Sequence, residues 1–146
     1  MREKLPRIEA ATARDGLRLD LRFEGDWTTT VDLSRFVAGF PSLAALADPA
    51  LFDRATVEEW GSGVTWDGEG PLSIAATTLY RLAAEQSGDE ARRFDAWMAR
   101  HGFSASKAAD ALGMTRRSII GYRTGSRPIP KVVALACKGW EAEHQR

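Results

Sequence analysis

Apolar and charged residues alternate along the opening part of the chain. From Leu17 to Phe23 every second residue is leucine or phenylalanine, with Arg or Asp between them, and this is the period of a strand with one buried face. Asp15-Gly16 predicts a tight two-residue hairpin that joins this strand to one near residues 7–13, because the dipeptide supplies positive φ angles. The chain is therefore expected to open with two antiparallel strands.

A third strand is expected to complete a β-meander. Gly25-Asp26 predicts the second turn, and the residues after it alternate again. One face of this strand carries Trp27, Thr29, Val31 and Leu33. Three antiparallel strands with one apolar side follow from this pattern.

The apolar side of the meander needs a cover. Residues 42–53, SLAALADPALFD, are expected to supply it as one or two short helical turns that start at Ser42 and are interrupted by Pro49. A further pair of short strands is expected after them.

Gly61-Ser62-Gly63 predicts the loop of a hairpin between these two short strands, since it is flanked by branched and aromatic residues. Trp60 and Trp66 are expected to bracket the loop. A glycine-rich phosphate cradle is the alternative, but it should lead into a helix, whereas this loop lies between strands.

A helix is expected from about Ala75 to Glu85, followed by a linker over residues 86–89. The expected fold class is α+β. A small antiparallel β-meander domain with short helices would occupy residues 1–86, and an all-α domain would occupy residues 87–146.

Helical periodicity dominates the second part. Phe94, Trp97 and Met98 recur at offsets of three and four, which predicts an amphipathic helix ended by Gly102. The apolar side of this helix is expected to contribute to the hydrophobic core of the second part.

Two short helices are expected next. Ser104 or Ser106 can cap the first, which would run to Leu112, and Gly113 can end it in a left-handed conformation. The chain then has only a short turn available before the second helix.

Thr115 can cap that second helix, which is expected to run from Arg116 to Arg123 and to end at Gly125. A last helix is expected from Pro130 to about Glu143.

Ala109, Gly113 and Ile119 have the spacing small-x3-Gly-x5-branched apolar. The alanine lets two steeply crossed helices approach, the glycine makes the turn, and the branched residue wedges the second helix against the first. In this spacing the segment resembles the helix-turn-helix of phage-repressor-like and Xre-like regulators, and the resemblance implies binding of double-stranded DNA.

In such a domain the first residues of the second helix meet base edges, so Arg116, Arg117 and Ile120 are the candidates for sequence reading. A second group is expected to meet phosphate through hydroxyls, charges and the amino end of the first motif helix. Its members are Ser104, Ser106, Lys107, Thr115, Arg123 and Arg127. The alternatives are a solvated helix surface for the arginines and simple capping for Ser104 and Thr115.

Gly121 departs from what a recognition helix should contain, because glycine in a helix costs roughly 1 kcal/mol relative to alanine. It could permit close approach to DNA, or it could mark a helix that does not bind.

Charge is distributed unevenly although the net charge is zero. Residues 1–88 hold nine Lys or Arg against fourteen Asp or Glu, a net charge of −5, and residues 89–146 hold eleven against six, a net charge of +5. Between His101 and Lys138 Asp110 is the single acidic residue. This basic stretch would attract a polyanion, and the acidic part could dock a protein partner.

The first part also carries an ordered series of short matches to a known pattern. The residues are Asp32-Leu33, Phe40-Pro41-Ser42-Leu43, Asp48-Pro49, Phe52, Gly63-Val64-Thr65-Trp66-Asp67-Gly68 and Leu79-Tyr80. In this order the chain resembles the bacterial domain of unknown function numbered 2442, although Pro71-Leu72-Ser73 stands where an acidic residue is usual. The resemblance implies no catalytic residues. Some members of this family resemble small antitoxins, and this implies binding of a protein partner.

An enzyme is not expected. His101 and His144 both lie at helix ends in the second part, away from any nucleophile, and no Cys/His cluster has metal-ligand spacing. The carboxylates of the first part look like exposed hairpin residues rather than a paired-acid site; they are Glu58, Glu59, Asp67 and Glu69. No cofactor is expected.

The sequence therefore predicts a DNA-binding transcriptional regulator that acts as a homodimer. The alternative is an antitoxin-like or other interaction protein whose helical domain touches no DNA. With no apolar run that could span a membrane, no export signal and Cys137 as its single, core-type cysteine, the protein is expected to be cytoplasmic.

Overall fold

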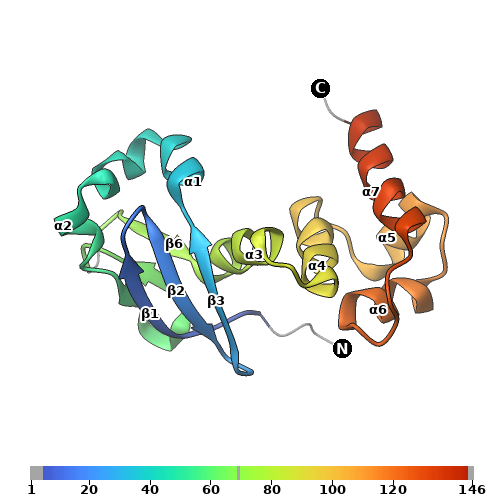
Figure 1. The fold of residues 1–146 in the computed structure, drawn as a ribbon, viewed down its shortest axis with the longest axis horizontal. Helices are drawn as coiled ribbons and strands as arrows, with labels where there is room; N and C mark the ends of the chain where they lie inside the picture. Colours follow the sequence, from blue (N-terminus) through green and yellow to red (C-terminus); the bar gives the residue numbers. More distant parts are fainter. Residues whose placement is uncertain (1–4, 69, 145–146) are drawn as a thin grey trace. The chain divides into compact units, whose positions relative to one another are not determined.

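The computed structural model describes residues 5–68 and 70–144. The chain divides into two compact units between Gln86 and Ser87. Figure 1 shows the strands in the first unit and helices α4 to α7 in the second. The fold is α+β, and each unit has a hydrophobic core of its own.

The first unit opens with an antiparallel meander in the order β1-β2-β3. Its strands are β1 (Ile8–Arg14), β2 (Arg18–Phe23) and β3 (Trp27–Asp32). Alternate residues of β2 and β3 are buried, as the period of two predicts; they are Leu19, Leu21, Phe23 and Val31, followed by Leu33 just after β3. The second turn is also confirmed, because Gly25 and Asp26 both have positive φ.

The first turn is longer than predicted. Arg14 pairs with Arg18, so the loop holds three residues rather than the two of Asp15-Gly16. Positive φ angles fall on Gly16 (79°) and Leu17 (58°). Leu17 therefore lies outside the strand, and the hairpin places a leucine in a left-handed conformation that favours glycine.

Helical cover for the meander begins earlier than predicted, with α1 (Ser34–Ala38), and continues through the 3₁₀ helix η1 (Pro41–Ala47). Pro49 opens the next helix, α2 (Pro49–Phe52), rather than only interrupting one. Proline fits this first position because it has no N–H to pair, and the Asp48 carboxylate caps the helix by accepting from the Ala50 amide at 3.1 Å. The expected cover is present, with one more helix than the sequence indicated.

A second antiparallel sheet has three strands rather than the predicted pair: β4 (Thr56–Val57), β5 (Gly63–Thr65) and β6 (Ser73–Ala75). A single 3₁₀ turn, η2 (Glu59–Gly61), connects β4 to β5. The two tryptophans near it differ. Trp66 is buried and donates from Nε1 to the Phe52 carbonyl at 2.9 Å, whereas Trp60 is 77% exposed.

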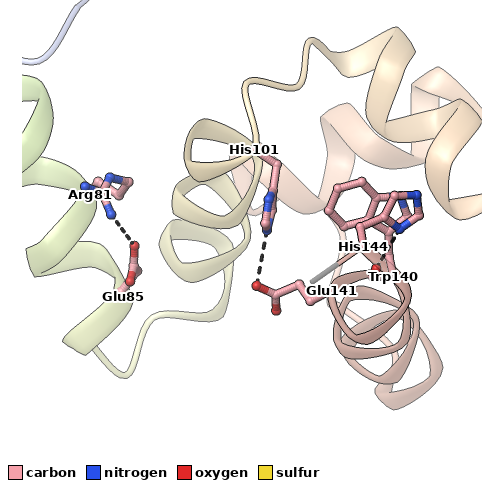
Figure 2. Close-up of polar contacts among 6 residues, drawn as sticks. All are labelled: Arg81, Glu85, His101, Trp140, Glu141 and His144. Atoms are coloured by element: carbon pink, nitrogen blue, oxygen red, sulfur yellow. Dashed lines mark hydrogen bonds and ion pairs between the residues drawn. The ribbon is translucent and has the colours of Figure 1, made fainter. Parts of the chain in front are cut away.

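Helix α3 (Ala76–Gln86) follows β6 directly, within one residue of the predicted start, and packs on β3, β5 and β6. Leu79, Ala83 and Ala84 are its fully buried residues. It also carries an ion pair at 3.2 Å between Arg81 and Glu85, whose side chains are both half-buried (Figure 2). Gln86 closes the unit, because its side-chain amide bonds both the amide and the carbonyl of Asp32.

The second unit, as far as residue 144, contains four helices: α4 (Glu90–Arg100), α5 (Ala105–Leu112), α6 (Arg116–Thr124) and α7 (Lys131–His144). The four predicted helices are confirmed within one or two residues at their ends. Phe94, Trp97 and Met98 form the buried stripe of α4. The α5 and α6 helices meet through alanine, since Ala105, Ala108 and Ala109 share the buried cluster with Ile119, which is completely buried.

Aromatic packing and a polar contact join α7 to the end of α4. His101 Nε2 lies 3.2 Å from Glu141 Oε2, and the His144 ring stacks on Trp140 at a centroid distance of 4.1 Å (Figure 2). Trp140 also packs edge-on against Trp97. Cys137 lies on the same side of α7 and is buried, which confirms its prediction as core.

Within residues 5–68 and 70–144, no helix combines the length and the apolar character that crossing a bilayer requires.

Candidate nucleic-acid interface

The α5 helix begins and ends at capping residues. Ser104 Oγ accepts from the Lys107 amide at 3.2 Å, so Ser104 rather than Ser106 is the cap. At the other end Gly113 adopts a left-handed conformation, with φ 67° and ψ 38°, and the Met114 amide donates to the Ala109 carbonyl at 2.9 Å. The chain therefore turns sharply after α5, and only Met114 and Thr115 separate Gly113 from α6.

The α6 helix starts at Thr115, whose hydroxyl oxygen accepts from the Ser118 amide at 3.1 Å. The two side-chain hydroxyls lie 3.0 Å apart, and the Thr115 hydroxyl can donate to Ser118 Oγ. At its end Gly125 is left-handed, with φ 83°. The predicted cap, helix and stop are confirmed, and they fix which side chains emerge from the first turn of α6.

The exposed face of α6 carries the residues predicted to read bases. Arg116, Arg117 and Ile120 are all exposed, and offsets of three and four place them on one side of the helix. Ile120 is 36% exposed, although its neighbour Ile119 is fully buried in the core. Thr124 extends the same face by one turn and was not predicted from the sequence.

Arg127 lies outside α6 but is held against it. Its amide donates to the Gly121 carbonyl at 3.0 Å, and its guanidinium Nη1 donates to Ser118 Oγ at 3.2 Å. Gly121 makes room for the aliphatic stem: a Cβ at that position would lie 2.7 Å from Arg127 Cδ and 2.8 Å from Cγ. Gly121 thus serves an intramolecular contact, which neither explanation drawn from the sequence included.

Arg123 has a different environment from the other candidates. Its Nε donates to Asp95 Oδ1 of α4 at 2.7 Å, and the two side chains are 24% and 23% exposed. This charge-assisted bond ties α6 to α4. The predicted phosphate contact of Arg123 stays a prediction, and it would have to compete with Asp95.

Ser106 and Lys107 are exposed in the first turn of α5. They lie beside the Ser104 cap, where the amide groups of the turn point away from the helix. The predicted phosphate contacts at the start of α5 are therefore all on accessible positions.

Positive charge collects at the amino end of α6. Arg116 and Arg117 start the helix, and the guanidinium of Arg127 is held at Ser118 in the same turn. Within residues 5–68 and 70–144, none of these three guanidiniums forms an ion pair with a carboxylate. Because the amino end of a helix is already the positive end of its dipole, the arrangement favours an anion there.

Three polar residues that organise this surface were not predicted from the sequence. Ser118 joins the Thr115 cap to Arg127, Asp95 binds Arg123, and Ser126 Oγ bonds the hydroxyl of Thr124 at 3.3 Å. The Thr-x-x-Ser spacing could have indicated Ser118. Asp95 and Arg123 are 28 residues apart and carry no local signal.

The described carboxylates of the first unit form no comparable cluster. Asp67 accepts from the Leu72 amide at 3.1 Å and so shapes the loop between β5 and β6. Glu58 and Glu59 lie at the start of η2, and Glu69 lies outside the described residues. In the part of the chain that the structure describes, no three His, Cys, Asp or Glu side chains are grouped to hold a metal ion.

Comparison with known proteins identifies the first unit. The chain belongs to the family described as "Protein of unknown function (DUF2442)", which matches residues 8–85. Among solved structures, a protein from Nitrosomonas europaea described as a "putative DNA binding protein" is 35% identical, with a TM-score of 0.66. The similarity covers 97% of this chain and 91% of that one. A comparison with curated proteins finds no match.

Proposed function

We propose that the chain is a DNA-binding transcriptional regulator in which α5 and α6 form a helix-turn-helix and α6 enters the major groove. The observation that carries the proposal is the group of three arginines at the amino end of α6, held there without carboxylate partners among the described residues. Like charges gathered at the positive end of a helix repel one another, and a phosphate backbone relieves this repulsion.

The similar protein from N. europaea supports the same function, since it is described as DNA binding and its similarity to this chain extends over both units. The helical unit contains the arginine group, so we assign DNA binding to that unit.

The proposed contacts divide into two kinds. Arg116, Arg117 and Ile120, on the exposed face of α6, would meet base edges. Phosphates would be met by Lys107 and Arg127 through their charge, and by hydroxyls and exposed amides at the starts of the two helices. The residues of this last group are Ser104, Ser106 and Thr115.

The regulator would act as a homodimer in the cytoplasm. A single module covers only a short half-site, and two modules about one helical turn apart on the duplex supply the affinity that a regulator needs.

Fluorescence anisotropy with labelled duplex DNA tests the function directly. The affinity should fall about tenfold or more between about 50 and 200 mM salt, because several condensed counterions are released on binding. Negligible affinity at the lower salt concentration would contradict the proposal. Selection from a random DNA pool would then identify the bound sequence.

A second function, binding of a protein partner by the first unit, is favoured by Trp60. Its side chain is 77% exposed, and its backbone is held at a φ of 65° within η2. Large exposed aromatic side chains dominate many protein interfaces, and the acidic neighbours Glu58 and Glu59 favour a basic partner. Loss of a partner on Trp60→Ala, with duplex binding retained, would show that the two functions are separate.

A further inference from the structure

Helix α7 has an apolar face that no described residue of its own unit covers. Val132 is 65% exposed and Leu135 is 55% exposed, while Val133 and Cys137 on the opposite side are buried in the core. At 100° per residue, Gly139 and Ala142 lie on the same face of the helix as Val132 and Leu135, and both are also exposed. The spacing of three, four and three residues is the one by which two helices pack along each other.

Gly139 is unexplained within a single chain. A glycine inside a helix costs about 1 kcal/mol relative to alanine. Its φ is not positive, and apart from its chain neighbours and the backbone of its own helix, no described residue has an atom within 4 Å of where its Cβ would lie. Close approach of a second backbone along this face would account for the missing side chain.

Charges flank the apolar face asymmetrically. Lys131 and Lys138 lie along one edge of it, and Glu143 lies along the other. When two copies of α7 pack in parallel, Lys138 of each copy faces Glu143 of the other, five residues further along. Antiparallel packing would instead bring the two Lys138 side chains together. The charges therefore favour a parallel pair of identical helices.

We infer that a second copy of this chain docks on α7 through a parallel helix pair. The contact comprises Val132, Leu135, Gly139 and Ala142, flanked by two Lys138–Glu143 ion pairs. This inference deepens the homodimer of the proposed function. It also places the dimer contact on the side of α7 opposite Val133 and Cys137.

Analytical ultracentrifugation of the full chain without DNA tests the interface. The wild type should show a reversible monomer–dimer equilibrium, and Leu135→Glu should be monomeric at every concentration. Either a wild type that stays monomeric or a Leu135→Glu variant that still dimerises would overturn the inference. The first outcome would also be the result if another protein, or another part of the chain, covers this face.

Charge reversal tests the parallel orientation. Lys138→Glu or Glu143→Lys alone should weaken dimerisation about tenfold, because each creates two like-charge contacts. The double variant Lys138→Glu/Glu143→Lys should recover to within about threefold of the wild type. If the double variant is as weak as the single ones, the parallel pair is wrong.

Gly139→Gln separates the interface from the fold. Glutamine is a better helix former than glycine and has open space in the monomer. At a protein concentration low enough for both proteins to be monomeric, the melting temperature should therefore be unchanged or higher. The dimer should nevertheless be lost, and its persistence would overturn the close approach at Gly139. All these readouts lack DNA, so a failure of DNA binding would leave them unaffected. A monomer that still binds duplex DNA would overturn the interface and the homodimer, and it would leave DNA binding by the second unit standing.

Discussion

The aliphatic stem of Arg127 lies across Gly121 of α6, at a separation that a methyl group on Gly121 would violate. A Cβ at that position would lie 2.7 Å from Arg127 Cδ and 3.3 Å from its Cβ. The glycine thus lets an arginine from beyond the helix bring its guanidinium to Ser118, in the first turn. Gly121 is a positioning residue in this account, and Arg127 makes the contact.

Gly121→Ala should therefore reduce the affinity for duplex DNA by displacing Arg127. The loss should be about three- to tenfold and should equal that of Arg127→Ala, because both changes remove one charged phosphate contact. The free energy of unfolding should change by less than about 1 kcal/mol, since alanine favours the helix and offsets the lost packing. Anisotropy and urea unfolding measure the two quantities.

Gly88→Ala is the matched control, because a Cβ there meets nothing within 4 Å. In the double variant Gly121→Ala/Arg127→Ala the two losses should not add, since they act on one contact. Additive losses, or wild-type affinity in Gly121→Ala alone, would show that the glycine does not position Arg127.

Asp95→Asn should destabilise the second unit. It removes the charge that binds Arg123 Nε at 2.7 Å between α4 and α6, while keeping the shape of the side chain. The expected loss in the free energy of unfolding is about 1 kcal/mol, because the pair is about one-quarter exposed. A double-mutant cycle with Arg123→Gln should give a coupling energy of similar size. Independent effects of the two changes would exclude the ion pair as a tie between the helices.

Because its thiol is buried, Cys137 is expected to make the folded protein less stable at alkaline pH. Burial, together with the nearby Glu141 carboxylate, raises the pKa of its thiol to about 11 from 9.0. Between these values the unfolded chain loses the thiol proton while the folded chain keeps it, so the free energy of unfolding falls as pH rises from 9 to 11.

The decline should be shallower in Cys137→Ala, which has no thiol to ionise. Urea unfolding of both proteins across this pH range separates the contribution of Cys137 from those of lysine and tyrosine. Parallel curves for the two proteins would rule out the raised pKa. Near neutral pH the folded thiol should also react more slowly with iodoacetamide than the unfolded one.

The parts of the fold that follow from short-range chemistry were predictable from the sequence. The Thr115 cap is a bond between its hydroxyl and an amide three residues on, the Gly113 stop is a local backbone conformation, and the alternation from Leu19 to Phe23 is set by the strand period. The place of Leu17 in the loop and the helix α1 were not predicted, because neither is marked by a short-range signal. The pairing of Arg14 with Arg18 decides the loop length, and no strong apolar period marks residues 34–38.

The candidate interface was predictable as a set of residues but not as an arrangement. Arg116, Arg117 and Ile120 share one face because helix geometry requires it. Arg123 and Arg127, in contrast, look alike in the sequence, yet one is held by Asp95 and the other by Ser118. Asp95 lies on another helix than Arg123, and Ser118 is separated from Arg127 by the turn after α6. Tertiary packing alone therefore distinguishes the two arginines.

The most direct test of the central claim is the affinity of Arg116→Ala/Arg117→Ala for duplex DNA at low salt. Arg14→Ala is the matched control, since Arg14 is an exposed arginine of the first unit, paired with Asp20. The double variant should remain folded and lose about 2 kcal/mol or more of binding free energy, which is about thirtyfold in affinity, while the control binds like the wild type. Equal affinity of the double variant and the wild type would contradict α6 as the DNA-reading helix.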